Sequence, residues 1–225
     1  MSKLILYHGS LAILQKPIFG VGKSYNDYGL GFYCTEHIEL AKEWACNEGV
    51  DGYANQYELE TDGLEILNLS AANFTILNWL AILLENRQVR LSTPIEKRGR
   101  DYLLENFKPE YDKYDVIIGY RADDSYFSFA RSFLANGISL KQLSYAMALG
   151  KLGEQVVLKS KKAFEALNFL GYTVADNSVY YAKRKVRDEQ ARKAFQLELE
   201  HEDADGIFIR DIIKEEMKPN DARLR

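Results

Sequence analysis

The chain contains little cysteine and tryptophan and has no long hydrophobic run. Two cysteines, Cys34 and Cys46, among 225 residues are too few for a disulfide framework and indicate a reducing compartment. Residues 1–3 lead directly into an apolar segment that is too short for the core of a signal peptide. The longest apolar stretch, residues 76–84, is interrupted by Asn78 and is far below membrane-spanning length. These absences predict a cytoplasmic protein with no membrane partner.

A strong charge excess and several common catalytic motifs are also missing. The formal net charge of −4 argues against a broad basic face for duplex nucleic acid. No glycine-rich phosphate loop, Gly-x-Ser-x-Gly elbow or His-Glu-x-x-His motif occurs. The histidines His8, His37 and His201 are too widely spaced to indicate a zinc site. Neither cysteine has a neighbour that would activate it as a nucleophile. We therefore expect no metal.

The composition is otherwise that of a globular protein with a sizeable core. Apolar residues make up 47% of the chain, with 15 Tyr and 11 Phe, so aromatic rings are expected in the core or in a groove. Strand-like segments are separated by clusters of helical segments, which predicts an α+β fold. Strands are expected over 3–7, 29–34, 53–60, 64–69, 114–120, 154–159 and 172–181, with a turn at 61–63 joining the third and fourth. Helices are expected over 36–46 (capped by Thr35), 73–84, after Pro94, and over 123–134, 139–149, 161–170, 183–200 and 206–217.

The composition changes beyond Lys183. Residues 183–200 form a strongly charged helical segment with a thin apolar stripe, which is most simply a solvated face; a partner-binding arm is the alternative. We therefore expect one domain over residues 1–182, with a helical insertion at about 72–108. A charged helical extension is expected over residues 183–225.

Three short segments carry the most specific signals. Residues 6–10 read Leu-Tyr-His-Gly-Ser, residues 27–34 read Asp-Tyr-Gly-Leu-Gly-Phe-Tyr-Cys, and residues 41–45 read Ala-Lys-Glu-Trp-Ala. Each has an ordinary structural explanation when it is taken alone. Glycines serve tight turns, a tyrosine suits a strand, and a histidine at a strand end is often structural. Their occurrence together is the informative feature.

This combination resembles the ADP-ribosyltransferase superfamily in its diphtheria-toxin and poly(ADP-ribose) polymerase branch. In detail it is similar to bacterial domains of that superfamily that share all three motifs and a closing segment like residues 205–213. The resemblance implies two small antiparallel sheets around an NAD cleft, with helical additions. It also implies release of nicotinamide from NAD and transfer of ADP-ribose to a protein or nucleic-acid acceptor. Similar bacterial transferases are toxins made beside a neutralising antitoxin, which is a further expected partner.

The resemblance assigns roles to individual residues. His8 would hold the adenosine ribose, and the backbone of Gly9, with Ser10 adjacent, would pair with the nicotinamide carboxamide. Tyr33 and Trp44 would stack on the two faces of nicotinamide. The same resemblance adds two further residues to the NAD-binding set, Asp27 and Gly31.

The third catalytic position lies in the predicted strand 154–159. Strand alternation puts Glu154 and Gln155 on opposite faces, so only one of them can point into the cleft. The resemblance favours Gln155, although glutamate is usual at this place in the superfamily. An amide offers less negative charge to a developing cation than a carboxylate does. We therefore expect single transfers or NAD hydrolysis rather than chain elongation. The alternative is an inactive module that binds NAD or ADP-ribose or acts as a scaffold.

A second polar cluster follows the predicted strand 114–120. Arg121, Asp123 or Asp124 would contact the pyrophosphate or the acceptor, while Asp123 is equally well explained as a helix cap. The loop over residues 19–25 corresponds to a lid in the superfamily, where Lys23 would approach the pyrophosphate.

Overall fold

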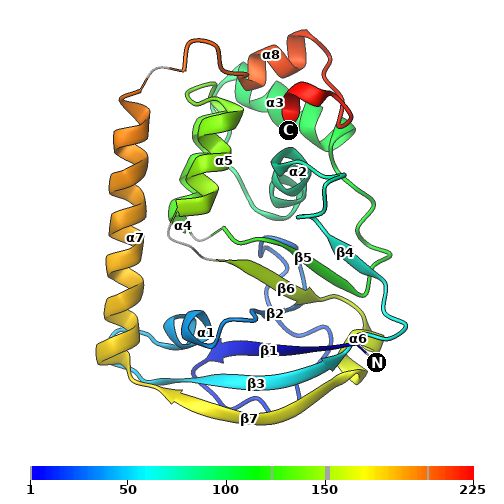
Figure 1. Cartoon of the computed structure of the whole chain (residues 1–225), viewed down its shortest axis with the longest axis vertical. Helices are drawn as coiled ribbons and strands as arrows, with labels where there is room; N and C mark the ends of the chain where they lie inside the picture. Colours follow the sequence, from blue (N-terminus) through cyan, green and yellow to red (C-terminus); the bar gives the residue numbers. More distant parts are fainter. Residues whose placement is uncertain (1, 123, 150–152, 202) are drawn as a thin grey trace.

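Two small sheets and a set of helices make up the fold of the computed structural model, which describes residues 2–122, 124–149, 153–201 and 203–225 (Figure 1). The first sheet is antiparallel and consists of β1 (Lys3–Ser10), β3 (Gly52–Glu60) and β7 (Leu167–Ala175), in the order β1-β3-β7. The second has the order β2-β6-β5-β4 and consists of β2 (Phe32–Cys34), β6 (Glu154–Leu158), β5 (Val116–Tyr120) and β4 (Ile66–Asn68). The β4–β5 pair is parallel, so this sheet is mixed. The predicted α+β class is confirmed.

The two sheets share a small hydrophobic core. It contains Leu6, Tyr57 and Leu59 from the first sheet, and Phe32, Val116, Val156 and Leu158 from the second. The sheets are also joined directly, because Tyr7 N donates to Thr35 O at 2.7 Å and Thr35 N donates to Tyr7 O at 2.9 Å. This pair of bonds brings the end of β1 beside the end of β2. The predicted histidine and tyrosine positions on these two strands are thereby brought close together.

A larger hydrophobic core lies among the helices that cover the second sheet. Its central element is α2 (Ile76–Asn86), in which every residue from Ile76 to Leu84 is buried. Around it pack α3 (Pro94–Asn106), α4 (Asp124–Leu134), α5 (Leu140–Ala148), α8 (Ile209–Lys214) and the short 3-10 turn η2 (Ala222–Leu224). Local signals explain where several of these helices start. Ser139 caps α5 by accepting from Gln142 N, and Pro94 occupies the first turn of α3.

Helix α1 (Ile38–Ala45) packs directly on the backbone of the first sheet. A Cβ atom at Gly9 would lie 2.0 Å from Ala41 O, and one at Gly52 would lie 2.1 Å from Ala45 O. Only glycine permits this approach. Thr35 is the expected cap, but the helix begins two residues later than predicted and its N-cap is His37; the Thr35 hydroxyl accepts from His37 N at 3.2 Å.

The long helix α7 (Asn177–Leu199) connects the first sheet and α1 with the helical part of the molecule (Figure 1). Near its start, the Tyr180 hydroxyl accepts from Lys42 Nζ of α1 at 3.1 Å, and at its middle Arg187 forms an ion pair with Glu43 of α1. Towards its end, the ring of Phe195 lies 4.0 Å from that of Phe129 in α4, measured between centroids. The buried residues Ala191 and Phe195 belong to the larger core. The segment beyond residue 183 is therefore packed on the rest of the chain along part of its length.

The segment 161–181 differs from the sequence prediction. The expected helix over 161–170 ends early, because α6 covers only Lys161–Glu165 and β7 begins at Leu167. Leu167 and Phe169, two residues apart, both pack on the small core, so strand periodicity prevails over helix propensity here. The strand expected over 172–181 ends at Ala175, and α7 starts at Asn177 rather than 183. The turn at 61–63 also joins strands of different sheets instead of a hairpin.

Within the described ranges, no helix has both the length and the apolar character needed to cross a bilayer.

Candidate functional site

A pocket of about 500 Å³ lies where β1, β2, β6 and α1 meet. Residues named in the sequence analysis line it from four separate elements. His8 and Gly9 come from β1, Tyr33 from β2 and Gly31 from directly before it, Trp44 from α1, and Gln155 from β6. The remaining lining residues are Leu14, Lys16, Pro17, Ile18, Val21, Gly22, Asn26, Asp27, Phe32, Arg87, Arg121 and Ala122. The fold thus gathers most of the predicted site residues around one cavity.

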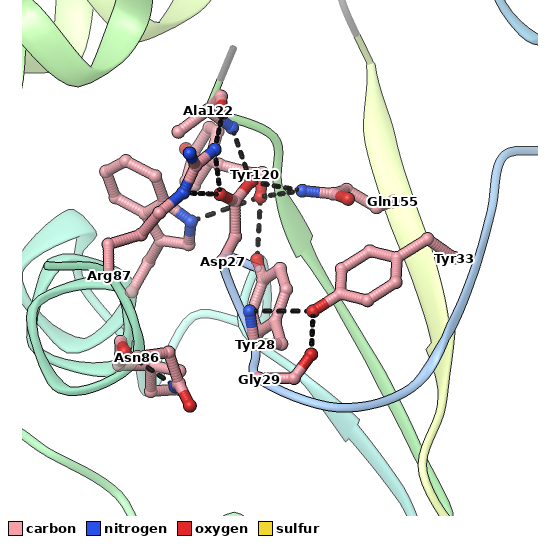
Figure 2. Close-up of polar contacts among 11 residues, drawn as sticks. Asp27, Tyr28, Gly29, Tyr33, Asn86, Arg87, Tyr120, Ala122 and Gln155 are labelled. Atoms are coloured by element: carbon pink, nitrogen blue, oxygen red, sulfur yellow. Dashed lines mark hydrogen bonds and ion pairs between the residues drawn. The ribbon is translucent and has the colours of Figure 1, made fainter. Parts of the chain in front are cut away.

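One wall of the pocket is a buried polar cluster of Asp27, Arg87, Ala122 and Gln155 (Figure 2). Arg87 Nε donates to Asp27 Oδ1 at 2.8 Å, and Arg87 Nη2 forms an ion pair with the same oxygen at 2.8 Å. Asp27 Oδ2 accepts from Ala122 N at 2.9 Å and from Gln155 Nε2 at 2.8 Å. Arg87 Nη2 also donates to Ala122 O at 2.8 Å. Both carboxylate oxygens of Asp27 are therefore occupied by protein donors, and this residue links the other three members of the cluster.

Gln155 and Glu154 point to opposite sides of β6, as strand alternation predicts. Gln155 is 3% exposed, lines the pocket and donates from Nε2 to Tyr120 O at 3.3 Å as well as to Asp27. Glu154 accepts instead from the hydroxyl of Ser70. Of the two candidates for the third position, Gln155 is the one that lies in the pocket wall.

The ring of Tyr33 is held by a closed loop that precedes β2 (Figure 2). Its hydroxyl donates to Gly29 O at 2.6 Å and accepts from Tyr28 N at 3.0 Å. Lys159 Nζ donates to Tyr28 O at 2.5 Å and to Leu30 O at 2.7 Å, fixing the same loop. Gly29 has a φ of +73°, which favours glycine. Burial raises the pKa of Tyr33 well above its usual value, so the phenol is neutral.

His8 is held between β1 and β2. Its ring stacks on Phe32 with centroids 4.4 Å apart and an interplanar angle of 29°. Its Nδ1 lies 2.7 Å from Tyr33 O. Because a carbonyl oxygen only accepts, Nδ1 carries the proton in this contact, and in the neutral ring Nε2 is an acceptor. Burial lowers the pKa of His8, which favours this neutral form.

Trp44 and Arg121 stack on each other in the pocket lining. The Arg121 guanidinium carbon lies 3.3 Å from the ring centroid of Trp44, a cation–π arrangement. The buried indole nitrogen Nε1 has no hydrogen-bond partner among the described residues. The expectation that Trp44 and Tyr33 both face the cavity agrees with the lining, but one face of Trp44 is in contact with Arg121. Asp123 lies outside the described residues, and Asp124 is the first residue of α4.

Close packing within the chain is sufficient to explain why Gly9 and Gly31 are glycines. Gly9 contacts α1 as described above, and a Cβ at Gly31 would lie 2.7 Å from a methyl carbon of Val157. Ser10 is outside the pocket lining. Its hydroxyl donates to Ala12 O at 2.6 Å and accepts from Asn55 Nδ2 at 3.1 Å. Ser10 thus shapes the start of the loop that follows β1.

The opposite wall is the pocket loop, residues 11–25, which has no regular secondary structure. Ile18 and Val21 line the pocket although 69% and 65% of their surfaces are exposed. The buried Asn55 anchors the start of the loop by accepting from Leu14 N at 2.9 Å. Lys16 lines the pocket, whereas the predicted Lys23 lies 5.9 Å from the ring of Tyr25.

Sequence reasoning missed several residues that shape this site. Arg87, Asn55 and Lys159 each bind a partner that is distant along the chain. Arg87 directly follows an apolar helix, and this pattern alone does not identify Asp27 as its partner. Of the buried polar cluster, Asp27 and Gln155 were predicted from the sequence, but Arg87 and Ala122 were not.

Titratable residues do not converge into a metal site in the described part of the chain, since no group of three or more His, Cys, Asp or Glu side chains comes together there. Cys34 is fully buried, and burial raises the pKa of its thiol well above the usual value. Its thiol is therefore protonated at neutral pH and unsuited to act as a nucleophile.

Comparison with known proteins gives one family and no individual relative. The model of a family described as "Protein of unknown function (DUF3990)" matches residues 4–169, a stretch that includes every residue lining the pocket. No curated protein matches the chain. No solved structure matches it.

Proposed function

The chain belongs to the DUF3990 family, and from the pocket of this member we propose that the protein is an NAD-dependent mono-ADP-ribosyltransferase. One observation carries the proposal. His8, Tyr33, Trp44 and Gln155, which the family resemblance nominates from four separate segments, line one pocket.

The chemistry of the lining fits NAD. Its volume of about 500 Å³ is within the range of small-molecule pockets. Tyr33 and Trp44 are flat surfaces suited to a nicotinamide ring. Lys16, Arg87 and Arg121 bring positive charge suited to a pyrophosphate. Trp44 Nε1 is a buried donor without a described partner, and an acceptor atom of a ligand would satisfy it.

NAD supplies an ADP-ribosyl group and a leaving group. The bond from the ribose carbon to nicotinamide breaks with its electron pair on nicotinamide, a bond forms to the acceptor nucleophile, and the acceptor's proton passes to solvent. The neutral ring of Tyr33 and the backbone of Gly9 would orient nicotinamide. His8 Nε2 and Gln155 Oε1 would each accept a hydrogen bond from a ribose hydroxyl. Acceptors near the developing positive charge lower the barrier when they are already in place.

We expect one ADP-ribose unit per acceptor site. Asp27 is the one acidic side chain among the described lining residues, and its oxygens are occupied by Arg87, Ala122 and Gln155. A carboxylate that could activate a ribose hydroxyl as a new acceptor is therefore missing from this lining. The same observation favours the second candidate function, a module that binds NAD or ADP-ribose without cleaving it.

Nicotinamide release from NAD by the purified protein separates the two functions. We expect release by the wild type and a reduction of roughly 10–1000-fold in Gln155→Ala, the range for loss of one transition-state hydrogen bond. Glu154→Ala is the matched control, because the neighbouring side chain faces away from the pocket, and it should be nearly unchanged. NAD binding without release would favour the binding module. No binding at millimolar NAD by calorimetry would overturn both.

The class of acceptor can be identified by incubating the protein with labelled NAD and a bacterial lysate and then locating the label. Digestion of protein and of nucleic acid in separate aliquots assigns the label to one of them, and long ladders on a gel would contradict single transfer. We also expect expression in a bacterium to slow growth unless a neutralising antitoxin is present. The double variant His8→Ala, Tyr33→Ala should be harmless.

A further inference from the structure

The hydrogen bonds of Gln155 determine which end of its amide faces the pocket. Nε2 lies 2.8 Å from Asp27 Oδ2 and 3.3 Å from Tyr120 O. A carboxylate and a carbonyl oxygen accept hydrogen bonds and cannot donate them. The nitrogen end must therefore face these two atoms, and the oxygen end must face away from them (Figure 2). In the described part of the chain, no donor contacts Oε1.

Both acceptors that hold the amide nitrogen are themselves fixed. Asp27 is tied on one side to Arg87 and on the other to Ala122 N. Tyr120 O also accepts from the Tyr28 hydroxyl at 2.7 Å and from Trp79 Nε1 at 3.1 Å. The reversed orientation of the Gln155 amide is therefore unfavourable, because its oxygen would then face two other hydrogen-bond acceptors.

We propose, on the basis of the proposed function, that Asp27 is a positioning residue that makes Gln155 a fixed and polarised hydrogen-bond acceptor for the sugar. An amide whose N–H donates to a carboxylate gains electron density on its oxygen, because linked hydrogen bonds polarise one another. The charge of Asp27 thus reaches the pocket through the amide, although its own oxygens are occupied. A ligand group at this point must be a donor, such as a ribose hydroxyl.

The same geometry explains why an amide occupies this position. A glutamate at residue 155 would place a second carboxylate beside Asp27, and two carboxylates at hydrogen-bond distance do not both ionise. The other ionisable groups around residue 155 do not supply a free cation for it. Arg87 is engaged with Asp27 Oδ1 and Ala122 O, and Arg121 stacks on Trp44. Burial keeps the phenols of Tyr28 and Tyr33 and the ring of His8 neutral by shifting each pKa towards the uncharged form.

The decisive variant is Gln155→Glu. When protonated, its carboxyl group matches the amide, since the O–H donates to Asp27 and the carbonyl oxygen faces the pocket. We expect its nicotinamide release, relative to wild type, to be greatest near about pH 5.5. The relative rate should then fall by roughly tenfold or more towards about pH 8.5 as the shared proton is lost. A glutamate acting directly as a carboxylate would give the opposite slope, which would overturn the proposal.

A second measurement does not depend on activity. The carboxyl of Gln155→Glu is held protonated in the folded protein but ionises normally in the unfolded chain, so its pKa is higher in the folded state. The stability of the variant relative to wild type should therefore fall as the pH rises above the unfolded value. Melting temperatures at several pH values report this difference. For Glu154→Gln, on the opposite face of β6, the melting-temperature difference from wild type should not grow with pH. Gln155→Met should lower activity about equally at every pH.

The two measurements separate the two ideas. If the wild type releases no nicotinamide, the proposed function fails, and the melting series still tests the Asp27–Gln155 arrangement. If the wild type is active but neither the rate ratio nor the melting difference of Gln155→Glu depends on pH, the inference about Asp27 fails.

Discussion

The two walls of the pocket are built on different principles. In the buried polar cluster of Asp27, Arg87, Ala122 and Gln155, four direct hydrogen bonds of 2.8–2.9 Å join the residues. The pocket loop instead presents Ile18 and Val21, whose side chains are mostly exposed. One wall is thus fixed before a ligand arrives, and the other has apolar surface that a ligand would cover.

This difference suggests a division of labour. Fixed acceptors and donors are useful where charge develops during a reaction, because they need no reorganisation. Exposed apolar residues on an irregular loop are suited to closing over a ligand and excluding water. Variants in the two walls should therefore differ in which quantity they change, with stability affected in one and ligand affinity in the other.

The largest effect is expected for Arg87→Ala. Asp27 is 5% exposed, and Arg87→Ala removes the cation paired with its buried carboxylate, leaving only the neutral donors Ala122 N and Gln155 Nε2. Breaking a buried ion pair in this way costs about 3–5 kcal/mol of unfolding free energy, measurable by urea denaturation. Arg90→Ala is the matched control at a nearby exposed arginine and should change stability by less than about 0.5 kcal/mol. A loss below about 1 kcal/mol in Arg87→Ala would show that the cluster does not stabilise this wall.

A smaller effect is expected from His8 as the pH falls. Burial lowers its pKa in the folded protein, so the unfolded chain binds a proton more readily. The stability that neutral His8 contributes is present above the unfolded pKa of about 6.5 and is lost as the pH falls through the folded pKa. Denaturation at about pH 7.5 and pH 5.5 should give a larger loss for wild type than for His8→Gln. Equal losses in the two proteins would contradict this assignment.

The smallest effect on stability is expected in the pocket loop. Ile18→Ser combined with Val21→Ser should change the unfolding free energy by less than about 0.5 kcal/mol, because both side chains are largely exposed. NAD binding by calorimetry should weaken by roughly fivefold, the equivalent of about 1 kcal/mol of lost apolar contact. Val50→Ser, at an exposed position outside the lining, should leave binding unchanged. An unaltered affinity in the double variant would show that the loop does not cover the ligand.

Local sequence patterns predicted the elements that depend on local interactions. A short apolar run before a turn predicted β1, alternation predicted β3, a segment apolar on nearly every side predicted α2, and Ser139 marked the start of α5. The prediction failed over residues 161–181, where the decisive interaction is pairing with β3. In that pairing Tyr57 lies opposite Phe169, a contact that no local pattern reveals. Edge-strand pairing overrode a segment with good helix formers.

In the candidate site, too, local motifs were predictable from the sequence, whereas contacts between distant residues were not. The motif residues His8, Tyr33 and Gln155 were identified in the sequence and lie in one lining. The residues that hold them were not, because their partners are remote. Arg87 is 60 positions from Asp27, and Lys159 is 131 positions from Tyr28. The contact of Arg121 with Trp44 was likewise unforeseen, since residue types alone did not reveal which ring a cation would cover.

Helix α7 limits how the pocket can open. Its first turns contact α1, where Lys42 Nζ donates to the Tyr180 hydroxyl at 3.1 Å, and its last turns contact α4 through Phe195 and Phe129. Because α7 is one uninterrupted helix of 23 residues, it spans from the sheet that carries His8 to the helices behind the sheet that carries Gln155 (Figure 1). A hinge between these two parts would have to break one of its end contacts. Relative movement of the parts of the fold that carry His8 and Gln155 is therefore opposed by a helix that itself contributes no residue to the pocket lining.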